Sequence, residues 1–168
     1  MKKTVRKLAS NDYQAVKEME KIVVEEYQHY LEETGEKDTI GPWITQEYFD
    51  HYLRTENSFV AEVDGKVVGF ILAQPTTYVR GAKREIWLEY IAVHPESRRM
   101  GIGSMLLSKT VELAHSHGVN LVHTSLNPNN SESVRLLVKH CFEVKDWKEA
   151  KRELKKREGR SLRWDSHE

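Results

Sequence analysis

Several features that would restrict this protein's class are scarce or absent in its sequence. Cys141 is the only cysteine, which excludes an intramolecular disulfide and gives no sign of an oxidising compartment. No long apolar run is present: Met1 is followed by two lysines but not by a hydrophobic segment, so we expect neither a signal peptide nor a membrane span. The sequence therefore predicts a cytoplasmic protein.

The chain also lacks an excess of either charge. Lysine and arginine together number 26, as do aspartate and glutamate, so no net charge recruits nucleic acid or an acidic membrane. A length of 168 residues is typical of one domain, which we place at 1–168. Residues 148–168 form a charged C-terminal tail, whose interleaved acids and bases favour a solvated helix over a binding site for RNA or an acidic partner.

The most informative stretch runs from Arg84 to Gly118. It begins with the segment Arg84 to Val93, which is rich in aromatic and β-branched residues and is followed by His94-Pro95, as is typical of a strand. After a short polar link, apolar residues recur at helical spacing from Ile102 onwards. Gly118 is the expected C-terminal cap of this helix.

A glycine-containing turn, Arg98-Arg99-Met100-Gly101-Ile102-Gly103-Ser104, lies between this strand and this helix. The first N–H groups of a helix have no intrahelical partner, and the helix dipole adds about half a positive charge there, so an anion is the natural occupant. Glycine lets a phosphate approach the backbone closely because no Cβ intervenes. The stretch therefore predicts a strand, an anion-binding turn and a helix.

Three kinds of phosphate-binding turn have glycines at a helix start. A Walker loop requires Lys and then Ser or Thr after its last glycine, whereas Ser104-Met105 follows Gly103. A dinucleotide fingerprint requires a third glycine where Leu106 stands, and it normally opens a domain. The segments Ile91-Ala92-Val93-His94-Pro95 and Arg98-x-x-Gly101-x-Gly103 instead closely resemble the acyl-CoA signature of the GNAT superfamily, the CoA-dependent N-acetyltransferases. A tight turn without a ligand is the remaining alternative.

The rest of the chain has a pattern compatible with this resemblance. In the first half, the sequence predicts a strand at 5–8, a helix from 13 after capping residues 10–12, a helix from 46 capped by Thr45, and a hairpin of 58–63 and 66–74 around Asp64-Gly65. The strand 84–93 and the helix from 101 follow. The last predicted elements are a strand at 119–126, a helix to about 140 with a capping box of Asn129 and Glu132, and strands at 142–147 and 161–164. This order matches the GNAT arrangement over about residues 4–147. We expect an α/β fold with a GNAT-type mixed, mostly antiparallel sheet flanked by helices on both faces.

The resemblance implies acetyl-CoA as cosubstrate and requires no metal. In the family, backbone N–H groups of the turn hold the pyrophosphate, and the end of the preceding strand pairs with pantetheine. The implied CoA-binding residues are Ile91, Ala92, Val93, Arg98, Arg99, Met100, Gly101, Ile102, Gly103, Ser104 and Asn130. For the two arginines an alternative is a solvated turn, and for Asn130 it is capping of the later helix.

A base or a desolvating site is required because an amine with its reference pKa of about 10.4 is mostly protonated at neutral pH. Glu85 and Glu89 share one face of the strand with Trp87, since strand side chains alternate with period two. Glu89 lies nearer to the thioester expected beside Ala92, so we rank it first as the catalytic base and Glu85 second, acting through water. A bulge in the strand would upset this alternation, and pairing of either glutamate with Lys83 or Arg84 is the structural alternative.

Two positions depart from the family pattern. Leu137 stands where many members have the tyrosine that protonates the departing thiolate, which leaves solvent, Tyr27, Tyr30, Tyr78 or no acid at all in this role. Cys141 replaces the usual glycine, and we expect it to be a packed apolar residue and not a nucleophile.

The acceptor site is expected between the first two helices and the loop before the strand 84–93. Acids concentrate there, and they would favour a cationic amine or simply form a solvated helix face. Aromatic residues in the same region would line a pocket or belong to the core. The acids are Glu25, Glu26, Glu32, Glu33, Glu36 and Asp38, and the aromatic residues are Tyr27, Tyr30, Trp43, Tyr48 and Tyr52.

The function predicted from these residues is transfer of an acetyl group from acetyl-CoA to a primary amine: a protein N-terminus, a lysine or a polyamine. The acceptor is thus a small molecule or a protein, with no nucleic acid and no membrane as partner, and a homodimer is left open. The eight histidines have no metal-ligand spacing, so no metal is expected. The alternatives are a non-catalytic acyl-CoA-binding regulatory module, suggested by Leu137, and a nucleotide-binding module.

Overall fold

The structure, a computed structural model, describes residues 1–36, 41–77, 84–127 and 129–145. Its elements follow the predicted order as far as residue 139. They are β1 (Lys3–Lys7), the 3-10 turn η1 (Ser10–Asp12), α1 (Tyr13–Thr34), α2 (Gln46–Thr55), β2 (Phe59–Val63), β3 (Lys66–Thr77), β4 (Arg84–Val93), the 3-10 turn η2 (Pro95–Ser97), α3 (Ile102–Ser116), β5 (Leu121–Thr124) and α4 (Ser131–Lys139).

In the described part of the chain, five strands form one sheet in the order β1-β2-β3-β4-β5. The pairs from β1 to β4 are antiparallel, and β4 and β5 are parallel. The hairpin turn predicted at Asp64-Gly65 is present, with φ values of 48° and 82°, the left-handed conformation that two-residue hairpin turns require. The predicted mixed, mostly antiparallel sheet is confirmed.

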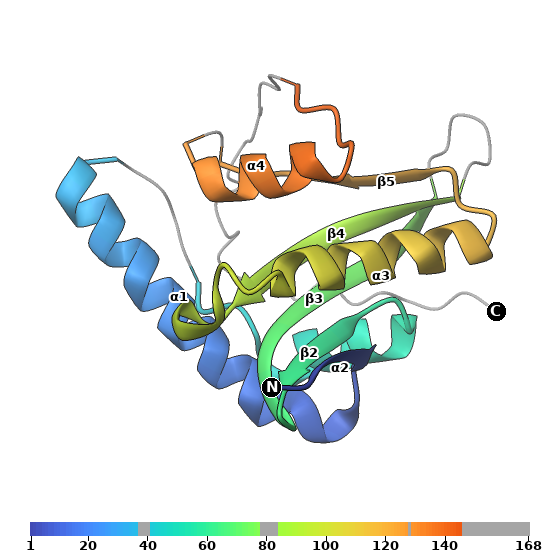
Figure 1. Cartoon of the computed structure of the whole chain (residues 1–168), viewed down its shortest axis with the longest axis horizontal. Coiled ribbons are helices and arrows are strands. Elements are labelled where there is room, and N and C mark those ends of the chain that lie inside the picture. Colours follow the sequence, from blue (N-terminus) through green and yellow to red (C-terminus); the bar gives the residue numbers. More distant parts are fainter. Residues whose placement is uncertain (37–40, 78–83, 128, 146–168) are drawn as a thin grey trace, which may run out of the picture.

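Helices cover both faces of this sheet (Figure 1). On one face, α3 and α4 pack against a core that includes Ile71, Leu88 and Leu106. On the other face, α1 and α2 pack against a second core around Phe49 and Phe70. Successive strand residues therefore point into different cores, and a functional side chain on β4 faces either α3 or the α1/α2 layer.

A buried carboxylate fixes the position of α2 relative to α1. Glu20 of α1 is fully buried, and its two oxygens accept backbone hydrogen bonds from Trp43, at 2.8 Å, and Ile44, at 3.0 Å. These contacts hold the segment that leads into α2, which then begins after Thr45, whose side chain accepts from Tyr48 N as predicted. Hydrogen bonds to a charged group are stronger than neutral ones, so Glu20 is an effective anchor.

Strand β3 is longer than the sequence pattern indicated. We expected Gln74-Pro75 to end it, but it continues to Thr77, and Pro75 stands opposite Ile86 of β4. The reason is that β2 pairs with β3 only as far as Ile71. Beyond that residue one edge of β3 has no strand partner among the described residues, so the missing N–H of proline is tolerated.

Two helix caps differ from those predicted. Asp12 does not cap α1 with its side chain; its carboxylate accepts from Arg6, at 2.7 and 2.8 Å, and from Ala9 N. The cap of α4 is Asn130, which accepts from Ser133 N at 3.0 Å, so the predicted capping box with Asn129 is wrong and the alternative role of Asn130 is confirmed.

The elements predicted near the C-terminus differ from those in the structure. Strand β5 is shorter than the predicted 119–126, and residues 142–145 form no strand. The rest of the sixth strand predicted at 142–147, the strand predicted at 161–164 and the charged tail lie outside the described residues. No helix in the described ranges is both long and apolar enough to cross a membrane.

Cys141 is exposed, so our expectation of a packed residue is wrong. It follows the end of α4 with a φ of 62°, and the N–H groups of Cys141 and Phe142 donate to Val138 and Leu137. This is the left-handed cap at which helices usually have glycine. The backbone therefore explains why glycine is the usual residue here.

We predict that Cys141→Gly raises the free energy of unfolding by about 1 kcal/mol, because glycine adopts a positive φ without the penalty that a Cβ brings. Denaturant-induced unfolding measures this change. Cys141→Ser keeps the Cβ and should give no gain; an equal gain in both variants would show that the thiol, not the backbone, causes the effect.

Candidate functional site

The pairing of β4 with β5 stops in the middle of β4. The last pair is Leu88 with Thr124, whose hydroxyl donates to Leu88 O at 2.9 Å. On the other edge of β4, Leu72 pairs with Tyr90 and Ala73 with Leu88, so Glu89 is an extra residue and forms a bulge. Beyond this point the two strands diverge (Figure 1).

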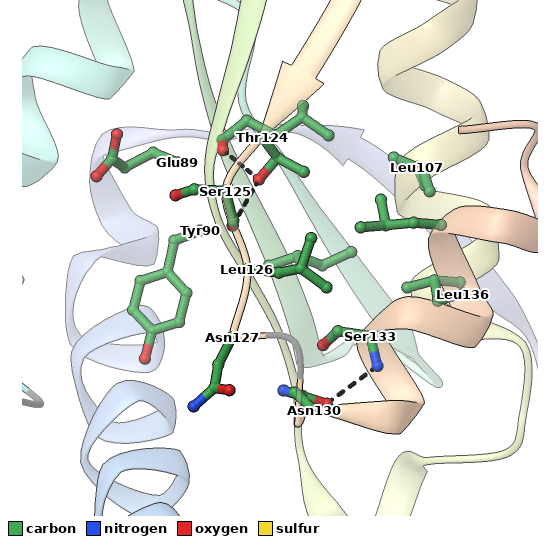
Figure 2. A pocket seen from close by; sticks show the side chains of 13 residues that line it. Glu89, Tyr90, Leu107, Thr124, Ser125, Leu126, Asn127, Asn130, Ser133 and Leu136 are labelled. Carbon is green, nitrogen blue, oxygen red and sulfur yellow. Dashed lines mark hydrogen bonds between the residues drawn. The ribbon is translucent and has the colours of Figure 1, made fainter. Parts of the chain in front are cut away.

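A cavity of about 170 Å³ lies where the strands diverge. One wall is the main chain from Leu88 to Ile91, and the opposite wall is the segment from Thr124 to Asn127 together with α4. Apolar side chains from α3 and α4, including Leu107 and Leu136, lie on one side of β4, whereas Glu89 and Tyr90 point to the other side (Figure 2). The cavity therefore connects the two faces of the sheet.

The bulge decides which β4 side chains share a face. Before it, Ile86 and Leu88 belong to the core under α3. After it, Tyr90 and Ala92 belong to the α1/α2 core, although simple alternation would put Tyr90 on the α3 face. Glu89 stays on the same face as Glu85 and Trp87, as predicted, because the bulge comes at Glu89 and not before it.

Glu89 is exposed and lies among aromatic side chains. Trp87 Nε1 donates to Glu89 Oε2 at 2.6 Å, so the two residues share a face as predicted. Burial, followed by the negative charge of Glu89, raises the pKa of Tyr52 to about 12. The same two causes, in the same order, raise the pKa of Tyr48. Glu89 is therefore a carboxylate at the junction of β4 and α2.

Glu85 is in a different environment from Glu89. Its side chain is only 10% exposed, and Oε2 is buried without a hydrogen-bond partner. His123 Nε2 of β5 is 3.4 Å from this oxygen. Sequence analysis missed His123, because only the parallel register, which places it opposite Trp87, brings it to this face.

The glycine turn precedes the start of α3, as predicted, and its binding of an anion stays a prediction. Gly101 has a φ of 80°, and a Cβ added there would meet no atom within 4 Å, so its outer side is open. Arg99 also has a positive φ, and Lys3 of β1 donates to Met100 O at 2.7 Å. Helix α3 begins at Ile102, with its first N–H groups directed outward from the helix start.

Arg98 connects this turn to α1. Its guanidinium bonds both carboxylate oxygens of Glu26, at 2.6 and 2.5 Å, and its Nε donates to Val93 O. The hydrogen bonds with Glu26 raise the pKa of Arg98. Arg98 thus holds the turn against the first helix, and a contact of Arg98 or Arg99 with phosphate stays a prediction.

Tyr27 of α1 reaches the far wall of the cavity. Asn127, which lines the cavity, donates to Tyr27 Oη at 2.6 Å. Tyr30 stacks on Tyr27 at 5.7 Å and donates to Glu36. Leu137, in contrast, is buried in the core beside the cavity, so α4 presents no hydroxyl at that position.

Most of the predicted acidic residues in and just after α1 have partners. Glu26 binds Arg98, and Glu36 accepts from Asn129 as well as from Tyr30. Glu25 and Glu33 lie near Lys21 and His29 of the same helix, and Asp38 is outside the described residues. Within the described ranges, no three His, Cys, Asp or Glu side chains are grouped as metal ligands are.

Comparison with known proteins identifies the family. Residues 4–160 match the family described as "Protein of unknown function (DUF1999)". The chain belongs to the DUF1999 family. A segment of 78 residues is 33% identical to L-2,4-diaminobutyric acid acetyltransferase of Nocardia farcinica, covering 46% of this chain and 38% of that protein. A segment of 73 residues is 40% identical to the probable N-acetyltransferase camello of Xenopus tropicalis. It covers 42% of this chain and 32% of that protein.

The DUF1999 chain spans less than half the length of these two curated relatives. Among solved structures, an aminoglycoside acetyltransferase, AAC(6')-Iy, bound to a bisubstrate analogue of CoA is similar over 92% of this chain and 99% of its own, with a TM-score of 0.70 and 17% identity. At this identity the likeness establishes the fold. The fold predicted from the resemblance to the GNAT superfamily is confirmed.

We predict that Glu89→Gln lowers the pKa of Tyr52 from about 12, because it removes the negative charge that adds to the effect of burial. A spectrophotometric titration of phenolate formation measures this. Because folding favours the protonated phenol, stability is retained below the usual tyrosine pKa of about 10 and is lost as pH rises towards the pKa in the folded state. The variant should lose less stability over that pH range. In a Tyr52→Phe background, Glu89→Gln should have a smaller effect on this loss of stability at high pH. If its effect is the same with and without Tyr52, Glu89 does not act on Tyr52.

Proposed function

We propose that this DUF1999 protein is an N-acetyltransferase that transfers the acetyl group of acetyl-CoA to a primary amine by direct attack. The acceptor is a protein N-terminus, a lysine or a polyamine. Its relatives include proteins named acetyltransferases of diaminobutyric acid and of aminoglycosides, which agrees with an amine acceptor. The activity, the acceptor and the residue roles given below are part of the proposal.

The divergence of β4 and β5 is the observation that best supports this function. Past the Leu88–Thr124 pair, one edge of β4 has no strand partner in the described part of the chain and borders the cavity, so an extended chain such as pantetheine would have backbone groups to pair with at Ile91, Ala92 and Val93. The open side of Gly101 and the start of α3 lie beyond the end of β4 and suit a pyrophosphate. Asn130, which also lines the cavity, caps α4 and could contact the CoA arm.

Glu89 has the required position for a base. The bulge places its carboxylate beside the end of the cavity, on the α1/α2 face. The acceptor ammonium would give one proton to Glu89 and then solvent, and the neutral nitrogen would attack the thioester carbon. The C–S bond breaks, and the second proton of the nitrogen passes to the CoA sulfur.

Protonation of the sulfur cannot use position 137 because Leu137 has no acidic group. Tyr27 is a candidate for this step, since its hydroxyl oxygen contacts Asn127 on the cavity wall. Tyr90 also lines the cavity, and burial, followed by the charge of Glu20, raises its pKa, so it is protonated at neutral pH. Tyr30 contacts Glu36 and is less suitable, and Tyr78 lies outside the described residues.

A non-catalytic acyl-CoA-binding module is the second candidate function, and Leu137 is the observation that favours it. Such a protein would bind acetyl-CoA but release no free CoA thiol with any amine. A nucleotide-binding module would instead prefer NAD. Calorimetric titration with acetyl-CoA and with NAD, followed by an assay for free thiol over a broad amine panel, separates the three.

We predict that acetyl-CoA binds and that Gly101→Ala weakens this binding about tenfold, because the added Cβ occupies the open side of the turn. Gly118→Ala is the matched control. Gly118 has a φ of 66° at the opposite end of α3, with no atom within 4 Å of an added Cβ, so both variants carry the same backbone strain. Equal weakening in both variants would contradict a phosphate site at Gly101.

We predict that Glu89→Gln lowers kcat by about 100-fold, the range of one general base, without weakening acetyl-CoA binding. Steady-state kinetics and calorimetry measure the two effects. Glu18→Gln, an exposed glutamate on α1, is the control and should retain full activity. A fully active Glu89→Gln variant would exclude Glu89 as the base.

A further inference from the structure

Trp87 gives the proposed base a defined hydrogen-bond donor. Glu89 is exposed, and an exposed carboxylate without a partner samples several rotamers. Here Trp87 Nε1 donates to Glu89 Oε2 at 2.6 Å, a short distance that is typical of a hydrogen bond to an ionised acceptor. An indole N–H can only donate and a carboxylate can only accept, so this bond has one direction. It therefore restricts the orientation of the carboxylate.

The indole of Trp87 is held in the sheet from both sides. Trp87 stands opposite Gln74 of β3 and opposite His123 of β5, and directly opposed residues are the closest side-chain neighbours in a sheet. Its ring meets the ring of His123 edge-on, with 4.9 Å between the ring centroids and 90° between the ring planes. The side chain is also partly buried. The direction in which Nε1 points is thus determined by neighbours on two strands.

His123 is held in turn by two polar side chains. Its Nε2 lies 3.5 Å from Thr76 Oγ1 and 3.4 Å from Glu85 Oε2. Thr76 and Glu85 stand opposite each other in the register of β3 and β4, and Glu85 is buried. Three strands therefore contribute to one connected set of contacts. The two polar side chains hold the imidazole, the imidazole packs on the indole, and the indole bonds the carboxylate of Glu89.

We propose that Trp87 is a positioning residue for the base Glu89. His123 holds the indole in place for this task, and Thr76 and Glu85 hold His123. The inference rests on the proposed acetyltransferase function. Because the indole N–H occupies Oε2, the proton of the acceptor ammonium goes to Oε1, and the freed lone pair of the nitrogen attacks the thioester carbon. Glu85 is a support in this arrangement and not a second base, which replaces the role that the sequence suggested for it.

The first test removes only the donor. Trp87→Phe keeps an aromatic ring against His123 but lacks the N–H group. It should lower kcat about tenfold, as expected for a lost hydrogen bond to a charged group, and leave KM for acetyl-CoA and for the amine unchanged, because the bond acts on proton transfer and not on binding. Tyr13→Phe is the matched control. It also removes a polar hydrogen from an aromatic side chain, but on α1 beside the second core, and should leave kcat unchanged.

A double variant separates positioning of the base from general support of the fold. If Trp87 acts only through Glu89, Trp87→Phe should have no further effect on kcat in a Glu89→Gln background, where no base remains to be positioned. A further loss of about tenfold in that background would overturn the inference, since the indole would then act on something other than Glu89.

A crystal structure of Trp87→Phe gives a readout that does not depend on activity. It should show the Glu89 side chain in more than one rotamer, and a single unchanged rotamer would contradict the inference. Thr76→Val keeps the β-branched shape but removes the hydroxyl beside His123, so it tests the same contacts even if Trp87→Phe does not fold. It should lower kcat about threefold, but not in the Glu89→Gln background. An unchanged kcat in Thr76→Val would contradict the support of Trp87 through His123.

The possible results separate this inference from the proposed function. If the wild type binds acetyl-CoA but acetylates no amine, the proposed function fails and the positioning role fails with it. If the wild type is active and Glu89→Gln is fully active too, the function stands, and both the base and its positioning residue are wrong. If Glu89→Gln loses activity and Trp87→Phe does not, the function and the base stand and only this inference is wrong.

Discussion

The end of the β4–β5 ladder is the constraint on which the rest of the site depends. Thr124 and Leu88 form the last pair of this ladder, and the next residue of β4, Glu89, is the extra residue of the bulge against β3. A closed parallel pair would have left no cavity and no free edge on β4. The bulge also turns Tyr90 and Ala92 towards α1 and α2, so one local irregularity determines which core each of these side chains faces.

The elements around this opening are held by charged contacts of different kinds. Glu20 is buried and binds backbone N–H groups ahead of α2, which makes it a structural anchor. Arg98 and Glu26 join the turn before α3 to α1 at the surface, where a single ion pair contributes little to stability but fixes the position of the turn. Glu85 is also buried, and its Oε2 lies 3.4 Å from His123 Nε2 of β5.

Chemistry at the proposed site would be divided between the two faces of the sheet. The glycine turn before α3 and the apolar side chains of α3 and α4 lie on one face, while Glu89, Tyr52 and Trp87 lie on the other. A thioester reaching through the cavity would therefore meet an acceptor that approaches from the α1/α2 side. Leu137 belongs to the core beside the cavity, so position 137 would supply no proton to a leaving thiolate.

The sequence by itself determined the features that depend on local pattern: the strand Arg84–Val93, the glycine turn before α3, the Asp64-Gly65 hairpin and the order of the elements. These follow from side-chain periodicity and backbone conformation, which act over a few residues. Only the tertiary structure decided the rest. Pro75 stays within β3 because β2 ends early, Cys141 takes a left-handed cap and not a core position, and His123 meets Glu85 through the parallel register of β5. Each of these depends on which strand or helix becomes a neighbour, and a neighbour distant in sequence leaves no local pattern.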